Sequence, residues 1–106
     1  MALAKMYAFG EGIPENNAEA VKWFRLAAEQ GYAIAQSNLG FAYANGFGVS
    51  QNNIRAYVWW SVAVAQGNED AKAYRDIISN RLTPALLGQA QQIATKCFDS
   101  DYQDCE

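Results

Sequence analysis

The sequence predicts an all-α protein, an α/α superhelical solenoid of about three antiparallel helix pairs. Three observations predict it: an internal repeat of 36 residues, apolar side chains at helical spacing within each repeat, and glycines at the expected helix ends. The chain has 106 residues, of which 51% are hydrophobic and 18% charged. This composition supplies enough apolar side chains for one core and is not that of a disordered chain.

The repeat is seen when the sequence is shifted by 36 residues against itself. Tryptophan, tyrosine and paired glycines coincide, and these are residues that chance rarely aligns. The identical pairs are Leu3 with Leu39, Tyr7 with Tyr43, Ala8 with Ala44, Gly10 with Gly46, Gly12 with Gly48, Asn16 with Asn52, Asn17 with Asn53, Ala20 with Ala56, Trp23 with Trp59, Ala27 with Ala63, Gln30 with Gln66, Gly31 with Gly67 and Ala35 with Ala71.

The first unit, residues 1–32, reads as two helices. The first helix is expected to end at Gly10, because glycine readily adopts the left-handed backbone conformation that terminates a helix. The second begins at Asn16, which has capping-box form with Glu19, and ends at Gly31. Its apolar stripe is Ala20, Trp23, Phe24 and Ala27.

The second unit, residues 33–68, repeats this pattern. A helix over 33–45 carries a stripe of Ala35, Leu39, Ala42 and Tyr43, and a helix over 53–66 carries one of Ala56, Trp59, Trp60 and Ala63. Gly46 and Gly67 end the two helices. We interpret Trp59 and Trp60, together with Trp23 and Phe24, as core residues rather than a ligand-stacking box; an exposed edge of Trp60 remains a candidate contact in an interface.

The third unit, residues 69–98, departs from the pattern because it has no Gly-x-Gly loop. Glu69 and Asp70 open its first helix, and Thr83 followed by Pro84 signals the start of its second. The second helix has an apolar stripe of Leu86, Ala90, Ile93 and Cys97 and an otherwise polar face. A degenerate unit with a polar outer side is typical of a solenoid cap. We therefore expect one domain over residues 1–98 and an acidic tail over 99–106.

Several classes of function are disfavoured. The net charge is −3, without a Lys/Arg cluster, so we expect no nucleic-acid partner. The longest apolar run, residues 56–65, is about half a membrane span, which predicts no membrane insertion, and no signal peptide opens the chain. The glycine pairs of the loops follow helices, so they are not phosphate-binding loops.

Enzymatic and metal chemistry also lack their residues. The chain has no histidine, and no serine is followed by lysine three residues later, which removes the usual serine and cysteine nucleophile systems. The acidic residues of the tail, Asp99, Asp101, Asp104 and Glu106, lack the spacing of a calcium loop and are expected to be solvated. We expect no cofactor, no metal site and no enzyme activity.

The motif of the second unit resembles the Sel-1-like repeat, a relative of the tetratricopeptide repeat. The string that carries the resemblance runs from Leu39 and Gly40 through Tyr43, Gly46 and Gly48, and then from Ala56 through Trp59, Trp60, Ala63, Gln66 and Gly67. The first unit matches it from Tyr7 to Gly31, and the resemblance covers residues 3–71. It implies an α/α superhelix whose concave face gathers partners, mostly as an adaptor in bacteria, although a few cysteine-rich relatives are described as β-lactamases or penicillin binders.

Two functions follow from these observations. We favour a non-enzymatic recognition module that binds a protein or peptide in a concave groove. The alternative is a structural segment that assembles only with itself or with the rest of a longer chain. A β-lactamase-like enzyme is disfavoured because the Ser-x-x-Lys nucleophile is absent.

The groove residues are predicted from the repeat pattern. If the first helix of each unit lines the concave face, the side chains off its Leu/Gly/Tyr stripe point into the groove. They are Lys5, Phe9, Ser37, Phe41 and Asn45. Phe9 and Phe41 have no packing role in the pattern, so we expect them to be the aromatic anchors.

The two cysteines lie in the last ten residues and none lies in the repeats. Asp99, Ser100 and Asp101 break the helix between Cys97 and Cys105, so a turn there brings the two sulfurs together. We favour a disulfide over two free thiols. A disulfide predicts an oxidising compartment, periplasmic or secreted, and free thiols leave a cytoplasmic location as the alternative.

The residues 1–9 are apolar nearly all round, with Lys5 as their one charge. A helix of this kind is normally buried on more than one side. We therefore expect either a further helix upstream in the natural protein or self-association through this first helix.

Overall fold

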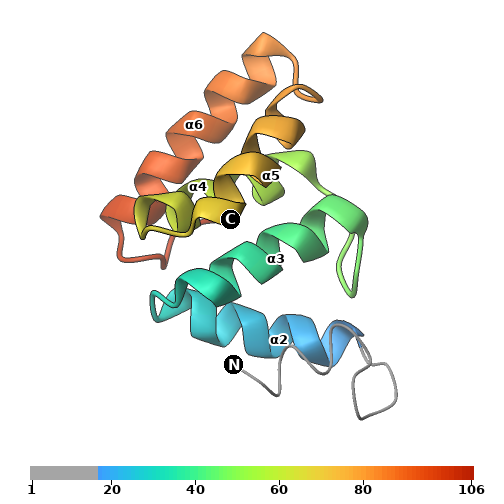
Figure 1. Ribbon diagram of the computed structural model, residues 1–106, viewed down its shortest axis with the longest axis vertical. Coiled ribbons are helices and arrows are strands. Elements are labelled where there is room, and N and C mark those ends of the chain that lie inside the picture. The colour runs from blue at the N-terminus through green and yellow to red at the C-terminus, as the bar shows by residue number, and fades with distance from the viewer. Residues whose placement is uncertain (1–16) are drawn as a thin grey trace.

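The computed structural model describes residues 17–106, which form five α-helices (Figure 1). They are α2 (Asn17–Glu29), α3 (Ala33–Asn45), α4 (Asn53–Ala65), α5 (Glu69–Ser79) and α6 (Pro84–Asp99). The predicted all-α class is confirmed. The first predicted helix, with Lys5 and Phe9, lies outside the described residues.

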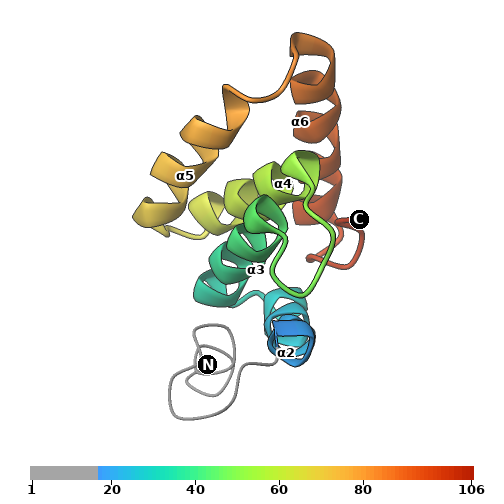
Figure 2. The same cartoon turned by 90° about the vertical axis from the view of Figure 1, so that its right-hand side faces the viewer.

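Helices α3 and α4 form the centre of the molecule. Helix α2 packs on α3, while α5 and α6 both pack on α4. Figure 2 shows α5 and α6 diverging from the loop that joins them, with the tail beneath α6 on the side away from α5. The side of the helices that carries α5 therefore differs from the side that carries the tail.

The helix boundaries follow the predicted capping signals. The side chain of Asn52 accepts a hydrogen bond from the backbone N–H of Arg55 at 3.0 Å, and that of Thr83 accepts one from Leu86 at 3.2 Å. Gly46 ends α3 with a φ of 71°, in the left-handed region that glycine adopts without a steric cost. The capping residue predicted for α2, Asn16, lies outside the described residues.

The core joins the apolar stripes of the four helices around α4. Phe24, Leu39, Trp59 and Trp60 are buried as predicted. Trp23 is not, because 43% of its surface is exposed, so its assignment to the core was wrong. Its repeat equivalent, Trp59, lies beside the tail and donates a hydrogen bond to Glu106.

One buried polar residue links three helices. The side chain of Gln36 in α3 is fully buried, and its Nε2 donates to the carbonyl of Ala28 in α2 at 3.1 Å. Its Oε1 accepts a hydrogen bond at 3.2 Å from Nε2 of Gln66, which follows α4. Because donor and acceptor are both paired, Gln36 is buried without an unsatisfied polar group.

The second helix of the cap presents a slightly different face from the one predicted. Ala90 and Cys97 are buried, but Leu86 is exposed, and Leu87 packs against the core in its place. Leu86 belongs to the first turn of α6, at the end of the helix that lies beside the loop from α5. The apolar stripe thus becomes buried only where α6 reaches α4.

The predicted disulfide between Cys97 and Cys105 is confirmed. It joins the end of α6 to the tail, with the two Cα atoms 4.3 Å apart. The chain reverses at Asp101 and Tyr102, whose φ angles are 55° and 67°. The reversal brings the tail segment, defined here as residues 100–106, back onto the helices.

Candidate functional site

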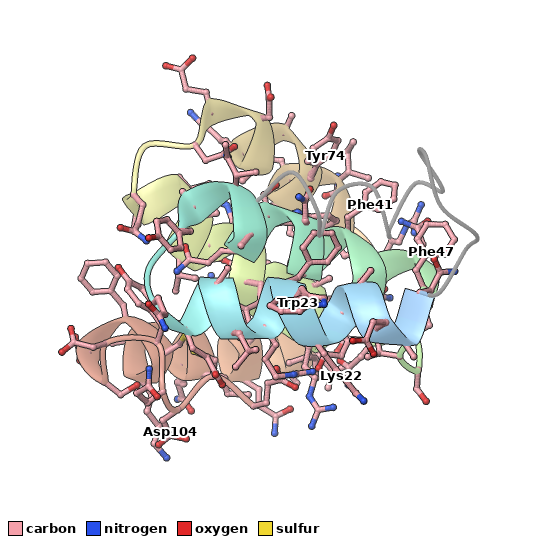
Figure 3. The ribbon with its side chains drawn as sticks, turned by 90° about the horizontal axis from the view of Figure 1, so that it is seen from below. Lys22, Trp23, Phe41, Phe47, Tyr74 and Asp104 are labelled. Atoms are coloured by element: carbon pink, nitrogen blue, oxygen red, sulfur yellow. A yellow bond between two sulfur atoms is a disulfide. The ribbon has the colours of Figure 1, made fainter. Side chains whose placement is uncertain are left out.

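An apolar groove lies between α3 and α5, with a hollow of about 130 Å³. We call it the α3–α5 groove. Side chains from three helices and from the residues after α5 line it: Phe41, Asn45, Trp60, Tyr74, Ile77 and Arg81. Figure 3 shows Phe41, Phe47 and Tyr74 on one side of the molecule and Asp104 of the tail on the opposite side.

The indole of Trp60 forms the floor of the groove. Only 4% of Trp60 is exposed, and its Nε1 donates to the backbone carbonyl of Ser37 at 3.0 Å. Its ring lies 5.5 Å from that of Tyr74, centroid to centroid. The hydrogen bond and the close approach of Gly40 hold the indole in one orientation, so the floor is rigid.

The rim of the groove is apolar, with one cation at its end. Ile77 is 56% exposed and Tyr74 is also exposed, whereas Phe41 is partly buried and lies 5.8 Å from Phe47. Helix α3 contributes no charged residue. The guanidinium of Arg81 has no ion-pair partner within residues 17–106. The groove therefore offers an apolar surface beside an unneutralised positive charge.

The residues predicted from the sequence are partly brought together. Phe41 and Asn45 line the groove, and Ser37 reaches it only through its carbonyl, which accepts from Trp60. Phe41 also packs against the core, a role that the repeat pattern did not predict. Lys5 and Phe9 lie outside the described residues.

The sequence reasoning missed the α5 wall of the groove. Tyr74, Ile77, Ile78 and Arg81 are spaced at i, i+3, i+4 and i+7, which places them on one face of a helix. The third unit was interpreted only as a cap, so no groove residue was predicted on this face. The helical spacing was the signal that would have found it.

A second hollow, of about 240 Å³, lies between α4 and α6. Ser61, Thr95 and Phe98 are among its lining residues. The Oγ atom of Ser61 is buried without a hydrogen-bond partner among the described residues. This hollow has a single aromatic side chain and no cation, so it offers fewer anchoring groups than the α3–α5 groove.

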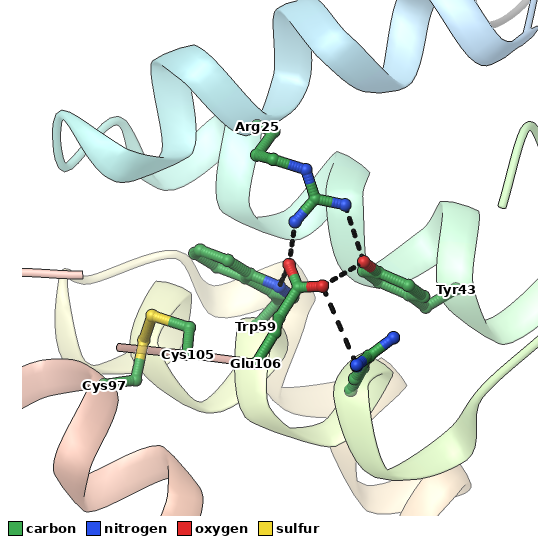
Figure 4. A network of polar contacts seen from close by, with 7 residues as sticks. Arg25, Tyr43, Trp59, Cys97, Cys105 and Glu106 are labelled. Atoms are coloured by element: carbon green, nitrogen blue, oxygen red, sulfur yellow. Dashed lines mark hydrogen bonds and ion pairs between the residues drawn. A yellow bond between two sulfur atoms is a disulfide. The ribbon is translucent and has the colours of Figure 1, made fainter. Parts of the chain in front are cut away.

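Away from these two hollows, one carboxylate is surrounded by side chains from three helices (Figure 4). Arg25 of α2 and Tyr43 of α3 both donate hydrogen bonds to Glu106, and Nε1 of Trp59 in α4 donates to it at 3.3 Å. Nε of Arg55 lies 3.7 Å from the same carboxylate. We call Arg25, Tyr43, Arg55 and Trp59 the carboxylate cluster.

Tyr43 is the centre of this cluster. Its hydroxyl accepts a hydrogen bond from Nη2 of Arg25 at 2.6 Å, and the guanidinium carbons of Arg25 and Arg55 lie 5.8 and 5.7 Å from its ring centroid. Burial, together with the hydrogen bond to Glu106, raises the pKa of Tyr43 above its ordinary value of 10.0. For Arg25, burial acts to lower the pKa, but the hydrogen bond with Tyr43 and the charge of Glu106 outweigh it, so the pKa is raised.

The expectation that the acidic tail is solvated is therefore wrong for Glu106. Only 20% of its side chain is exposed, whereas Asp101 and Asp104 are exposed as predicted. A carboxylate bound by two guanidinium groups, an indole N–H and a phenol is stabilised by charge-assisted hydrogen bonds. No local sequence pattern predicts these contacts, because Glu106 and Arg25 are 81 residues apart in the sequence.

Within residues 17–106, no three acidic or cysteine side chains gather in a way that could hold a metal ion. None of the helices in that part of the chain combines the length and hydrophobicity needed to cross a membrane.

A family model described as the Sel1 repeat matches residues 1–32 and 33–68. Among solved structures, a protective antigen with an SLR fold from uropathogenic Escherichia coli strains is 28% identical, with a TM-score of 0.89 over 95% of this chain and 23% of that protein. A Sel1 repeat protein from Oxalobacter formigenes is 37% identical, with a TM-score of 0.67 over 71% of this chain and 56% of that protein. No curated protein matches the sequence. The chain thus spans about a quarter and about half of these two longer proteins.

Proposed function

The chain belongs to the Sel1 repeat family, and on that premise we propose that it is a recognition module that binds a segment of another polypeptide in the α3–α5 groove. The observation that carries the proposal is the gathering of Tyr74, Ile77 and Phe41 around the rigid floor of Trp60. An exposed apolar hollow lined by aromatic side chains is typical of a peptide-binding surface.

The electrostatics of the groove define the partner further. The free cation is Arg81, and no carboxylate belongs to the groove lining. We therefore propose a peptide segment that places a large apolar side chain in the hollow and a carboxylate beside Arg81. A non-enzymatic role is supported by the same lining, which contains no nucleophile next to a general base.

The compartment is part of this proposal. The disulfide between Cys97 and Cys105 supports an oxidising location, periplasmic or secreted, because cytosolic thiols are kept reduced. A peptide partner that meets the module there has to be an exported protein or a surface protein.

The test is a selection of random peptides displayed on phage against the oxidised chain. We expect enrichment of sequences in which an aromatic or large aliphatic residue is followed or preceded by Asp or Glu. The selected peptide is then titrated against Ile77→Asp and, as the matched control, Ile34→Asp, since both isoleucines are helical and exposed, by 56% and 60%. Ile77→Asp should weaken binding at least tenfold and Ile34→Asp less than twofold.

The alternative function, a structural segment of a longer solenoid, is favoured by one observation: the chain spans only part of the solved structures that it resembles. The two functions give different results in the same titration. A structural segment yields no enriched peptide class, or peptides that bind Ile77→Asp as well as the natural chain. Light scattering on the chain then tells whether copies assemble with each other.

A further inference from the structure

The carboxylate cluster has the composition of an anion receptor. Among residues 17–106, Glu106 supplies the one carboxylate in ion-pair contact with Arg25 or Arg55. Without Glu106, two guanidinium groups and the indole N–H of Trp59 would lose a shared acceptor. Trp59 is buried, and a buried donor left unpaired is costly, so the cluster favours an occupied state.

The disulfide tethers the occupant, Glu106, to α6 across a strained turn. Glu106 follows Cys105 directly, and Cys105 is bonded to Cys97 at the end of α6. Between the cysteines, Asp101 and Tyr102 both have left-handed φ angles, which are strained for residues other than glycine. The backbone of the tail segment thus opposes its own folded position, and the disulfide and the contacts of Glu106 counter that cost.

We propose that the carboxylate cluster is a binding site for an acidic peptide segment, which Glu106 occupies while the Cys97–Cys105 disulfide is intact and which a second polypeptide occupies after reduction. The segment that fits carries a glutamate side chain, the group that Glu106 places among these donors. The cluster shares no residue with the lining of the α3–α5 groove, so it is independent of the function proposed above.

The switching step requires a dithiol reductant. The dithiol gives two electrons and two protons to the disulfide, whose S–S bond breaks to leave one thiol on Cys97 and one on Cys105, and the reductant becomes a disulfide itself. After the bond has broken, the local concentration of Glu106 at the cluster falls, because the strained turn is no longer closed covalently. A second acidic segment then competes for the same donors.

The experiment uses the full chain and a labelled synthetic peptide with the sequence of residues 99–106 and serine in place of Cys105. Its binding is measured by fluorescence anisotropy to the oxidised chain and to the chain reduced with dithiothreitol. We expect at least tenfold tighter binding to the reduced chain. We also expect at least a tenfold loss of affinity when the peptide carries glutamine in place of its one glutamate. Equal affinity of the oxidised and reduced chains, or of the two peptides, would overturn the proposal.

Two variants keep the test independent of folding. Glu106→Gln with the disulfide intact leaves the fold covalently closed but removes the occupant's charge, so it should bind the peptide more tightly than the oxidised natural chain. In the reduced chain, Arg55→Gln should weaken peptide binding at least fivefold, whereas Lys72→Gln, which removes an exposed cation from α5, should change it less than twofold. Equal effects of these two charge removals would show attraction by the net charge alone and would refute a specific site.

Discussion

Gly40 of α3 and Trp60 of α4 lie so close that a β-carbon on residue 40 would be 2.8 Å from the indole Cδ1 and Nε1 atoms. The indole cannot move away without losing the hydrogen bond that it donates to the carbonyl of Ser37. Glycine at this position therefore allows the tight packing of α3 on α4 and fixes the floor of the α3–α5 groove.

The first prediction follows from this contact. Gly40→Ala should lower the free energy of unfolding by up to about 2 kcal/mol, because overpacking costs about 1–3 kcal/mol and the gain in helix propensity offsets about 1 kcal/mol of it. In a Trp60→Phe background the same change should be neutral or stabilising. The first repeat already has this smaller combination, since Ala4 and Phe24 occupy the equivalent positions.

Urea denaturation measures both effects, with Gly88→Ala as the control. Gly88 lies in α6 and an added β-carbon there meets nothing within 4 Å, so its substitution should stabilise the chain by up to about 1 kcal/mol. Additive costs of Gly40→Ala and Trp60→Phe would contradict the steric explanation.

The second prediction concerns Gly48 in the loop between α3 and α4. Its φ is 73°, and a β-carbon would lie 2.3 Å from the backbone carbonyl oxygen of Asn17 at the start of α2. Gly48→Ala should therefore cost at least about 3 kcal/mol, from left-handed strain plus a clash with backbone. Gly67→Ala has the strain alone, since its φ is 92° and nothing lies within 4 Å, and should cost about 1–2 kcal/mol. Thermal unfolding of the two variants compares them, and equal losses would show that the contact with Asn17 has no energetic weight.

The third prediction is a pH dependence that depends on Tyr43. Burial and the hydrogen bond to Glu106 raise the pKa of Tyr43 in the folded chain above the value of 10.0 expected when unfolded. A raised pKa means that the stabilising contribution is complete below pH 10 and is lost as the pH rises through the folded pKa. The free energy of unfolding should consequently fall more steeply above pH 10 in the natural chain than in Tyr43→Phe. Parallel curves for the two chains between pH 8 and 11 would contradict this assignment.

The fourth prediction concerns the energetic role of the disulfide. Replacing Cys97 and Cys105 together by alanine should lower the free energy of unfolding by about 2–3 kcal/mol, the chain-entropy value for so short a loop. Reduction of the natural chain should give nearly the same loss in urea denaturation. A loss below about 0.5 kcal/mol in both experiments would mean that the tail segment is held by its non-covalent contacts alone.

The sequence predicts the fold well because each repeat carries local signals. Trp23 and Trp59 match each other in the 36-residue repeat. Within each unit, the left-handed glycines and the Thr83-Pro84 start mark helix ends through residues one or two turns apart. It predicts less well which side chains are buried. Trp23 and Trp59 occupy equivalent positions in the repeat, yet only Trp59 is buried, because burial depends on what packs outside the unit.

The candidate sites show the same limit. The repeat pattern predicts Phe41 and Asn45 because they lie off the Leu/Gly/Tyr stripe of α3. The opposite wall belongs to α5, whose approach is set by the packing of the third unit. The contacts of Glu106 with Arg25 depend on the reversal of the chain after Cys97. Such long-range contacts leave no periodic signal in the sequence.

The central claim, recognition of an acidic and apolar peptide by the α3–α5 groove, is tested most directly by two-dimensional NMR of the ¹⁵N-labelled chain titrated with a peptide selected as above. The account predicts that the largest shift changes fall on Asn45, Ile77 and Arg81 and on the indole N–H of Trp60, with little change at Arg55 and Gln103 on the other side. Shift changes centred on the tail segment and the carboxylate cluster, or spread evenly over all helices, would contradict it.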